Sequence, residues 1–482
     1  MQAQINRITD VLRRDDGING AMAYTEQISW ILFLKFFDDY EQTQAATAML
    51  NGQEYTHILN KTHQRDIRAC RKTTDGNRDI NNSMSGDDLK DFVNNDLFPY
   101  LKSFRDPSQD YHSMKYKIGE IFYFLDNKIE SGHTLREILD IVDILSFQSK
   151  TDLFELSKVY EDLLQGMGSD GGNSGEYYTP RAVVKAMVKC LDPQIGQTIY
   201  DGATGSGWFL IEAFEHLKPQ AKSTEQLHFL HNDTLYGNEK TPIAYIMGVM
   251  NLILHGIENP NLSKKNTLTE DIRKFEEKDR FDVIIANPPF GGKEKDQIQA
   301  NFPIKSNATE MLFMQHFMKK LKTGGKSAII VPEWVLFNTN NSFQEVKKLL
   351  LNDFNITSIV SLPVGIFLPY SGVKTNIIFF EKTTATKKIR YYEVDPARKL
   401  TKNKPITYND MSELVKLFKD KPATEKSRYI DVADIKDYDL SAKNPAKIKV
   451  IIHRSLTEIL ADIEKNNEQI TISSQKLKNI LW

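Results

Sequence analysis

The sequence predicts an α/β protein in which a mostly parallel β-sheet is covered by helices, with an α-helical region before it and a helical tail after it. Three patterns support this prediction. Apolar residues recur at helical spacing in the first part of the chain, short β-rich runs alternate with helical stretches in the middle, and the last part is polar and lysine-rich. A glycine-rich segment separates the first two parts.

The composition limits the classes of protein that fit. The chain has 482 residues and a formal net charge of −2, and at ~150 residues per domain it should hold about three folded units. Because duplex DNA is bound largely through Lys and Arg, a nearly neutral chain that acts on DNA should need a partner. Cys70 and Cys190 make neither a disulfide framework nor a zinc site. Since no segment resembles a signal peptide or a membrane span, we expect a soluble cytoplasmic protein with no membrane partner.

The patterns divide the chain into three domains. Residues 1–165 should form an α-helical N-terminal domain, because segments such as "QINRITDVLRR" and "LREILDIVDILSF" carry helical periodicity. Residues 166–382 should form the α/β domain, which opens with the loop-like segment "GMGSDGGNSGEYYTP". Residues 383–482 should form a C-terminal extension that ends in a long helix.

The α/β domain shows six strand-like runs. They are "QTIYD" (197–201), "TLYGNE" (234–239), "FDVIIAN" (281–287), "KSAIIVP" (326–332), "ITSIVSLP" (356–363) and "TNIIFFEK" (375–382). Helix-like segments such as "PRAVVKAMVKCL" and "EMLFMQHFMKKLK" lie between most of them. Near-continuous apolar strands that alternate with helices predict a mostly parallel sheet buried on both faces.

A glycine-rich turn, "DGATGSGW", follows the first strand. Ligands of open α/β sheets bind at the carboxyl ends of strands, beside such turns. Gly205 and Gly207 would let the backbone approach a ligand closely. The turn is not a phosphate-binding P-loop, and it matches a nicotinamide-type G-x-G-x-x-G poorly because Asp201 precedes the first glycine. Taken alone, it also fits a purely structural role.

An acidic residue, Glu239, follows the second strand, where a carboxylate can accept both hydroxyls of a ribose. The gap from the glycine turn is longer than the usual ~20 residues. The intervening segment "EHLKPQAKSTEQLHFLHND" would then be an insertion. Taken alone, Glu239 also fits a solvated surface charge.

The tetrapeptide "NPPF", Asn287 to Phe290, ends a buried strand. Asn and Pro favour turns, and a double proline cannot continue a central strand, so a simple turn is one interpretation. An Asn/Asp/Ser-Pro-Pro-aromatic sequence should nevertheless occur by chance in only about one protein in a hundred of this size. Its place after a buried strand, in the same domain as the glycine turn, favours a functional role.

The NPPF tetrapeptide resembles the catalytic motif of amino-group methyltransferases that use S-adenosylmethionine. "DGATGSG" resembles their cofactor turn, and "GEYYTPR" (175–181) resembles the segment that closes over the cofactor's methionine part. Their order along the chain is that of the gamma class of DNA adenine-N6 methyltransferases. The helical N-terminal region, "NTL" (266–268) and "LPVGIFLPYSGVKTNIIFFEK" (362–382) are similar to the modification subunit of type I restriction–modification systems. The similarity is weakest from about residue 383 to 440.

The resemblance implies a Rossmann-like S-adenosylmethionine-dependent methyltransferase fold, S-adenosyl-L-methionine as the cofactor, no metal, and an adenine-specific DNA methyltransferase activity. Glu239 would bind the ribose, and Asn266 to Leu268 would lie near the adenine edge of the cofactor. The other implied cofactor-binding residues are Glu176, Tyr177, Tyr178, Thr179, Pro180, Arg181, Asp201, Thr204, Gly205, Ser206, Gly207 and Trp208. Gly202 and Trp208 depart from the family, which often has proline and a small residue at these positions.

The implied catalytic residues are Asn287, Pro288, Pro289 and Phe290. An exocyclic adenine amine is a poor nucleophile because its lone pair is delocalised into the ring. The Asn287 side-chain oxygen and the Pro288 carbonyl can accept its two N–H groups and localise the lone pair, and the prolines hold that carbonyl rigidly. Phe290 can stack on the base, a contact worth ~1–3 kcal/mol. In duplex DNA the adenine must first leave the stack.

The resemblance also implies partners. Enzymes of this class read sequence with a module of about 150 residues, a full domain by size, and too little chain remains here. We therefore expect a specificity (S) subunit, an M2S1 complex, a restriction (R) subunit in the full system, and double-stranded DNA as substrate. Candidate docking surfaces are the N-terminal stripe Ile5, Ile8 and Leu12, and the stripe Ile448 to Ile463 on a helix from Pro445. Packing on the chain's own core is the alternative for both stripes.

Three other functions remain open at this point. An amine methyltransferase acting on RNA or on protein glutamine would share the NPP-aromatic motif, but such enzymes usually lack the long helical N-terminal region. A non-catalytic scaffold with a methyltransferase fold is disfavoured by the intact Asn287. A nicotinamide dehydrogenase is disfavoured by the glycine spacing.

Overall fold

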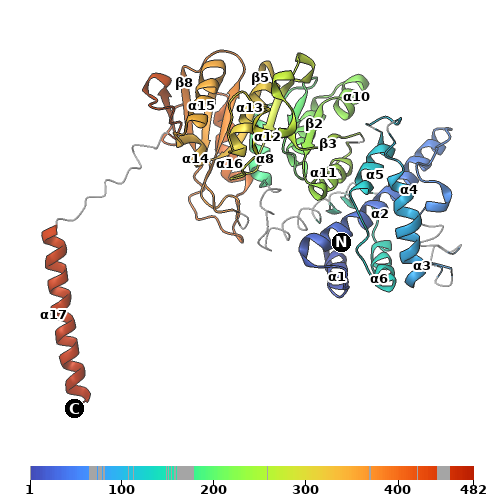
Figure 1. The fold of residues 1–482 in the computed structure, drawn as a ribbon, viewed down its shortest axis with the longest axis horizontal. Helices are drawn as coiled ribbons and strands as arrows, with labels where there is room; N and C mark the ends of the chain where they lie inside the picture. The colour runs from blue at the N-terminus through green and yellow to red at the C-terminus, as the bar shows by residue number, and fades with distance from the viewer. Residues whose placement is uncertain are drawn as a thin grey trace. The chain divides into compact units, whose positions relative to one another are not determined.

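The computed structural model describes residues 2–64, 73, 79, 82–106, 108–111, 113–147, 149, 151, 152, 155, 156, 159, 179–257, 259–368, 371–420, 422–441 and 456–481. The chain divides into two compact units, Met1–Leu440 and Ser441–Trp482. The first unit holds a helical region followed by a mixed β-sheet with its helices, and the described part of the second unit is a helix (Figure 1).

In the described part of the N-terminal region, all secondary-structure elements are helices or helical turns. Its elements are α1 (Gln2–Leu12), α2 (Gly20–Leu50), the 3-10 turn η1 (Lys61–His63), α3 (Gly86–Asp91), the π-helix η2 (Phe92–Leu97), α4 (Phe98–Lys102), α5 (Met114–Tyr123) and α6 (Gly132–Asp143). The apolar stripe of α1 faces inward, since Ile5, Ile8 and Leu12 are each at most 1 % exposed. The prediction that this stripe docks a partner is therefore wrong, and the alternative of packing on the chain's own core is confirmed.

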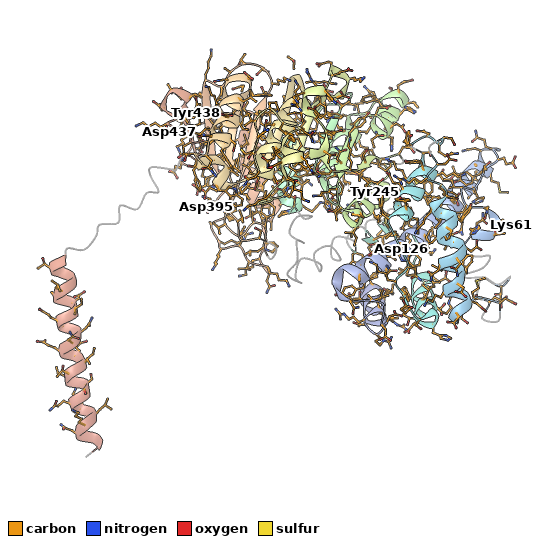
Figure 2. All side chains as sticks on the ribbon, viewed as in Figure 1. Lys61, Asp126, Tyr245, Asp395, Asp437 and Tyr438 are labelled. Atoms are coloured by element: carbon orange, nitrogen blue, oxygen red, sulfur yellow. The ribbon has the colours of Figure 1, made fainter. Side chains whose placement is uncertain are left out.

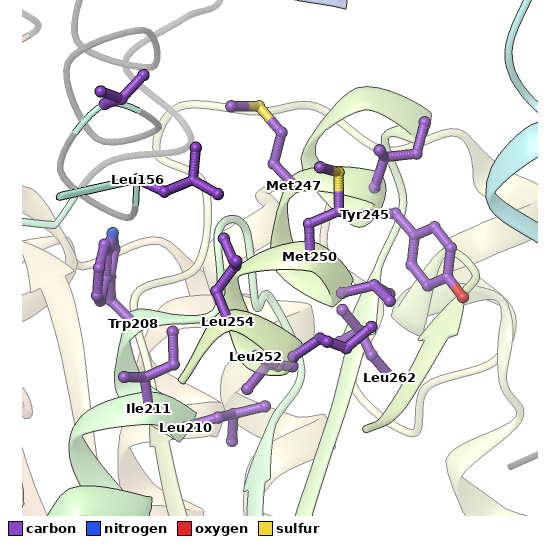
Figure 3. Close-up of a cluster of buried hydrophobic side chains, with 14 of the residues drawn as sticks. Leu156, Trp208, Leu210, Ile211, Tyr245, Met247, Met250, Leu252, Leu254 and Leu262 are labelled. Carbon is purple, nitrogen blue, oxygen red and sulfur yellow. The ribbon is translucent and has the colours of Figure 1, made fainter. Parts of the chain in front are cut away.

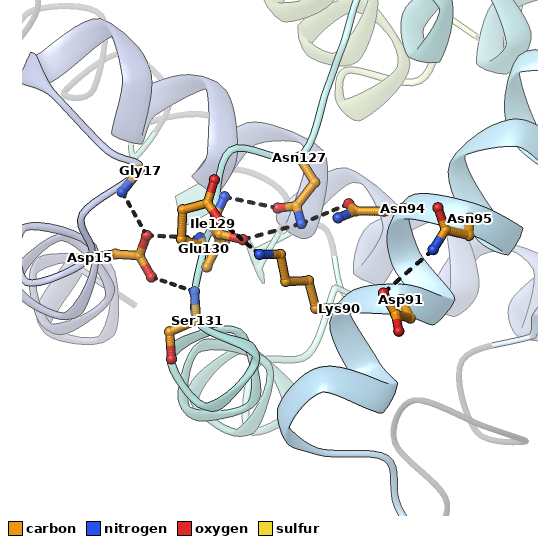
Figure 4. Close-up of polar contacts among 10 residues, drawn as sticks. All are labelled: Asp15, Gly17, Lys90, Asp91, Asn94, Asn95, Asn127, Ile129, Glu130 and Ser131. Atoms are coloured by element: carbon orange, nitrogen blue, oxygen red, sulfur yellow. Dashed lines mark hydrogen bonds and ion pairs between the residues drawn. The ribbon is translucent and has the colours of Figure 1, made fainter.

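A buried carboxylate fastens the loop after α1 to the loop before α6 (Figure 4). Asp15 accepts hydrogen bonds from the backbone amides of Gly17, Glu130 and Ser131, at 3.1, 2.9 and 3.1 Å. Close packing of the two loops requires a glycine at position 17, because a Cβ atom there would lie 2.0 Å from the carbonyl oxygen of Lys128. Asp15 and the close packing at Gly17 therefore tie these two loops to each other.

Within the described residues, nine strands form one mixed sheet in the order β3-β2-β1-β4-β5-β7-β6-β8-β9. The strands are β1 (Ile199–Asp201), β2 (Leu235–Glu239), β3 (Asn261–Lys264), β4 (Phe281–Ala286), β5 (Leu321–Pro332), β6 (Asn355–Ser361), β7 (Thr375–Glu381), β8 (Lys388–Glu393) and β9 (Ser427–Asp431). Strands β1 to β5 pair in parallel, and β7 lies antiparallel between β5 and β6. The carboxyl ends of β1, β2, β3, β4, β5 and β6 therefore meet along one edge of the sheet.

Helices cover both faces of this sheet, as predicted. They are α8 (Arg181–Leu191), α9 (Trp208–Leu217), α10 (Thr224–Asn232), α11 (Pro242–Leu254), α12 (Asp296–Gln299), α13 (Thr309–Lys320), α14 (Glu333–Phe337), α15 (Asn341–Asp353) and α16 (Tyr408–Phe418). Short 3-10 turns lie at Lys218–Gln220, Thr267–Thr269, Ile272–Lys274, Glu277–Asp279 and Val432–Asp434. Neighbouring residues of β1 point to opposite faces: Ile199 joins the core beneath α8 and α9, whereas the Tyr200 hydroxyl lies 3.1 Å from His316 Nε2 on α13.

The six predicted strands coincide with β1, β2, β4, β5, β6 and β7. Strands β3, β8 and β9 were not predicted. Because β8 and β9 extend the sheet beyond residue 382, part of the predicted C-terminal extension belongs to the same sheet as the glycine turn. The domain boundaries at 165 and 382 stay predictions.

The helical region contacts the sheet through α5. Lys117 on this helix is 5 % exposed, and its Nζ donates a hydrogen bond of 2.9 Å to the backbone carbonyl of Leu262 on β3. Burial lowers the pKa of Lys117. The Tyr245 hydroxyl on α11, labelled in Figure 2, donates to the carboxylate of Glu120 on the same side of α5. These contacts fix α5 against the strand that leads into residues 265–268.

The described part of the second unit is α17 (Leu456–Leu481). The predicted C-terminal helix is confirmed over these residues, whereas Pro445, Ile448, Ile451 and Ile452 lie outside the described residues. Among the described helices, none is both long enough and apolar enough to cross a lipid bilayer.

Candidate active site

The glycine turn between β1 and α9 has the backbone conformation that its sequence predicts. Gly205 and Gly207 have φ angles of 53° and 85°, a left-handed region that favours glycine. Two hydrogen bonds to Asp201 close the turn. Ala203 N donates to Asp201 Oδ1 at 3.0 Å, and Thr204 Oγ1 donates to the Asp201 carbonyl at 2.8 Å. Asp201 is fully buried, and its Oδ2 has no hydrogen-bond partner among the described residues.

Glu239 at the end of β2 is linked directly to this turn. Its carboxylate accepts hydrogen bonds from Gly205 N at 2.9 Å and from Thr241 N at 2.7 Å. Burial raises the pKa of Glu239. The two acidic residues that the sequence singled out thus lie on neighbouring strand ends and share one turn.

Asn287 follows β4 and lies on the other side of the turn. Its Nδ2 donates to Thr179 Oγ1 at 3.0 Å, and its buried Oδ1 has no hydrogen-bond partner in the described part of the chain. A small cleft of about 20 Å³ joins Asn287 to Thr179 and to the turn. The remaining residues of this cleft are Ala203, Thr204, Gly205, Ser206, Trp208 and Phe209.

A larger cavity of about 240 Å³ lies on the Glu239 side of the turn. Its lining includes Gly202 and Ala203 of the turn, Pro289 of the NPPF motif, and Asn266 to Leu268. The other lining residues are Asn238, Glu239, Lys240, Thr241, Lys265, Gly292, Lys293, Glu294, Thr309 and Phe313. Because Ala203 lines both hollows, the cavity and the small cleft flank the same turn.

The segment after the NPPF motif is anchored on both sides. The Phe290 ring meets the Phe367 ring edge-on, with centroids 5.9 Å apart and planes at 82°. The backbone amide of Gly291, which has a φ angle of 71°, donates to the buried carboxylate of Glu310 at the start of α13. Burial raises the pKa of Glu310.

Trp208, the residue that departs from the resembled family, holds the start of α8 against α9. The Arg181 guanidinium lies 3.6 Å from the centroid of its indole ring, and the His255 ring meets the indole edge-on at 5.4 Å. Burial lowers the pKa of His255 to about 4, so this ring is neutral near pH 7. Figure 3 shows Trp208 in one cluster with apolar side chains of α9 and α11, among them Ile211 and Leu254.

Burial, with a smaller contribution from Glu239, raises the pKa of Asp201 to about 8. In the unfolded chain the pKa of an aspartate is ~3.9. The neutral acid therefore contributes stability that is complete below about pH 4 and is lost as the pH rises to about 8. We expect the unfolding free energy of the wild type to fall over this window by a few kcal/mol relative to Asp201→Asn, which has no titrating proton.

Urea unfolding of the wild type and Asp201→Asn at a series of pH values measures this difference. The asparagine can still accept the hydrogen bond from Ala203, so the variant isolates ionisation from geometry. Parallel pH dependences for the two proteins would show that Asp201 does not titrate with a raised pKa.

The structure brings most of the predicted site residues together. The glycine turn, Glu239, Thr179 and Asn287 line the two hollows or bond to residues that do. Pro180 is the N-cap of α8, and Glu176, Tyr177 and Tyr178 lie outside the described residues. The roles of all these residues stay predictions. Among the described residues, no group of three or more His, Cys, Asp or Glu side chains is placed to hold a metal ion.

Sequence reasoning missed several residues of the site. Asn251 on α11 donates from Nδ2 to the Ser206 carbonyl at 2.8 Å, and it could have been found as a single amide in an apolar helix. Thr309, Phe313 and Lys293 line the larger cavity, but no spacing in the sequence links them to it.

Comparison with known proteins decides the family. The family model described as N-6 DNA Methylase matches residues 150–452, and the model described as HsdM N-terminal domain matches residues 1–142. The chain belongs to the N-6 DNA methylase family. The EcoEI methylase subunit of the type I restriction enzyme of Escherichia coli is 36 % identical to it over 392 residues, which are 81 % of this chain and 76 % of that protein.

Solved structures agree with this assignment of the methylase. A modification subunit of a type I restriction enzyme from Vibrio vulnificus YJ016 has 33 % identity and a TM-score of 0.84, over 94 % of this chain and 99 % of that one. A chain from a structure of type I R-M system assembly and conformational transition has 37 % identity and a TM-score of 0.77, over 99 % and 97 % of the two chains. The predicted S-adenosylmethionine-dependent methyltransferase fold and the resemblance to type I modification subunits are thereby confirmed.

Proposed function

We propose that this methylase transfers a methyl group from S-adenosylmethionine to the N6 amine of adenine in duplex DNA, as an adenine-specific modification subunit. The observation that carries the proposal is the placement of Asn287. Its buried side-chain oxygen, without a partner among the described residues, lies in one cleft with the glycine turn, so that an amine acceptor and a cofactor turn are adjacent. An acceptor aimed at a reacting amine is what such a transfer needs.

The residues present fit S-adenosylmethionine. When bound, this molecule supplies a methyl group made electrophilic by a sulfonium centre. Asp201 offers a buried carboxyl group beside the turn, with one oxygen that has no partner among the described residues, and Glu239 on the neighbouring strand end offers a carboxylate to the ribose hydroxyls. The larger cavity beside Glu239 would take the nucleoside half, and Thr179 and Asn287 on the other side of the turn would lie near the methionine half.

Asn287 and Pro288 would activate the target amine. The Asn287 Oδ1 atom and the Pro288 carbonyl would each accept one N–H group of the adenine amine, which localises the lone pair on nitrogen. Because the prolines fix φ, the carbonyl needs no reorganisation when the reaction occurs. Phe290, whose edge-on contact with Phe367 sets its ring plane, would stack on the flipped base.

The proposal includes partners. Relatives of this methylase are methylase subunits of type I restriction enzymes, and a near-neutral chain fits a division of labour in which another polypeptide reads the DNA sequence. We therefore include a specificity subunit in an M2S1 complex, and a restriction subunit in the full system. The helix α17 is the proposed docking element for the specificity subunit.

Methyl transfer in a reconstituted system tests the proposed function. The methylase is mixed with a candidate specificity subunit from the same genome, unmodified duplex DNA and S-adenosylmethionine, and nucleosides are then analysed by mass spectrometry. We expect N6-methyladenine at one defined sequence, and none when the specificity subunit is omitted. Methylation of RNA or of a protein glutamine with unmodified DNA would replace the proposal, and binding of S-adenosylmethionine with no transfer to any substrate would favour a scaffold.

A further inference from the structure

The first turn of α13 is fastened to the segment that follows the NPPF motif. Thr309 N donates to the Gly292 carbonyl at 3.2 Å, and Lys293 and Ala308 form an antiparallel bridge. On the next residue, Glu310 accepts the hydrogen bond from Gly291 N. Thr309 and Glu310 are 3 % and 2 % exposed, so this turn is part of the interior.

The Thr309 hydroxyl has a position that packing alone does not explain. Its Oγ1 atom is buried, lacks a hydrogen-bond partner among the described residues, and belongs to a side chain that lines the 240 Å³ cavity. Burial of a hydroxyl group removes its hydrogen bonds to water, and the folded state loses stability when no other partner replaces them. The Thr309 hydroxyl lies close to the backbone of Gly292, because this residue has no side chain: a Cβ atom there would lie 2.4 Å from Thr309 Oγ1. A hydrogen bond to a ligand in the cavity would offset this loss.

The residues that line the cavity indicate which kind of ligand it would bind. Glu239 suits a vicinal diol, Asn266 offers an amide, and Pro289, Leu268 and Phe313 provide apolar walls for a flat ring. A nucleoside combines these three features, whereas the amino-acid end of the cofactor has none of them. The cavity therefore matches the nucleoside half of the methyl donor.

We infer that Thr309 is a binding residue for that half: its hydroxyl hydrogen-bonds the nucleoside, and the same helical turn joins it to Gly291 and Gly292 after the catalytic motif. This inference rests on the proposed function and deepens it, because no sequence motif assigned Thr309 to the cofactor. Thr309 thus touches the cofactor, whereas Glu310 bonds to Gly291 after the motif.

Calorimetric titration of the full-length methylase with S-adenosylmethionine and with 5′-methylthioadenosine, which lacks the amino-acid end, tests the inference. Thr309→Val keeps the shape and the packing over Gly292 but removes the hydroxyl, and Thr309→Ser keeps the hydroxyl. We expect Thr309→Val to bind both ligands about fivefold to tenfold more weakly, and Thr309→Ser to bind both within about twofold of the wild type. Thr357→Val on β6, away from the cavity, is the matched control.

Four other results would each overturn the inference. Wild-type affinity of Thr309→Val for 5′-methylthioadenosine would overturn the inference, as would equal losses in Thr309→Val and Thr309→Ser, which would indicate packing. A loss for S-adenosylmethionine alone would place Thr309 at the amino-acid end and also overturn it. A wild type that binds neither ligand and methylates no DNA would instead overturn the proposed function, and the inference with it.

Discussion

Asn287→Ala should lower the rate of methyl transfer by at least about 10³-fold while leaving the affinity for S-adenosylmethionine within about threefold of the wild type. The substitution removes the Oδ1 acceptor on one face of the cleft but leaves the glycine turn, Asp201 and Glu239 in place. A group that acts only on the transition state changes kcat far more than it changes ground-state binding. Asn287 also donates to Thr179, so a small effect on the methionine half of the cleft is expected.

Single-turnover methylation of a duplex, with the specificity subunit present, measures the rate, and calorimetry measures cofactor affinity. Asn266→Ala is the matched control, because it removes an amide from the nucleoside cavity and not from the reacting centre. This control should raise the concentration of cofactor needed while preserving the rate at saturation. If Asn287→Ala kept more than about a tenth of the wild-type rate, the catalytic role of the residue would be excluded.

Ile463→Glu combined with Ile470→Glu should abolish co-purification of the methylase with its specificity subunit. Within α17, Leu456, Ile463, Ile470 and Leu477 recur every seventh residue, the repeat of a helix that packs against another helix. Ile463, Ile470 and Leu477 are 49 %, 65 % and 59 % exposed. Charges placed on this stripe would have to be buried in a helix–helix seam, at a cost of several kcal/mol each.

The exchange of Lys465 and Glu468, as Lys465→Glu with Glu468→Lys, is the control on the opposite side of α17, and it leaves the net charge unchanged. Both variants should unfold at the wild-type urea concentration and bind S-adenosylmethionine normally. Sequence-specific methylation should be lost with the stripe variant only. Retention of the specificity subunit by the stripe variant would show that another surface docks it.

The sequence predicted those parts of the fold that depend on local pattern. Strands such as β4 and β7 are continuous apolar runs, and the positive φ of Gly205 and Gly207 follows from a turn that only glycine makes easily. Strands β3 and β9 are short, polar and at the two edges of the sheet, so pairing with a neighbour rather than composition decides their conformation. Strand β8 was not predicted from the sequence, because one of its two faces carries Arg390, a fully buried arginine.

The candidate site shows the same division. Asn287, Glu239 and the glycine turn could be predicted, because each directly follows a recognisable strand and carboxyl ends of parallel strands converge. Thr309 could not be predicted from the sequence, since a Thr-Glu pair at a helix start usually signals capping. Its contribution depends on how α13 lies across the end of the NPPF segment, and tertiary packing alone decides that placement.

The hydrogen bond from Lys117 to the Leu262 carbonyl connects the helical region to the strand that leads into the larger cavity. Only three residues separate that carbonyl from Asn266, and the chain between them is the stiff end of a paired strand. A tilt of α5 would therefore shift residues 265–268, which line the larger cavity. The N-terminal helices and the larger cavity are thus joined by one hydrogen bond and a short stretch of strand.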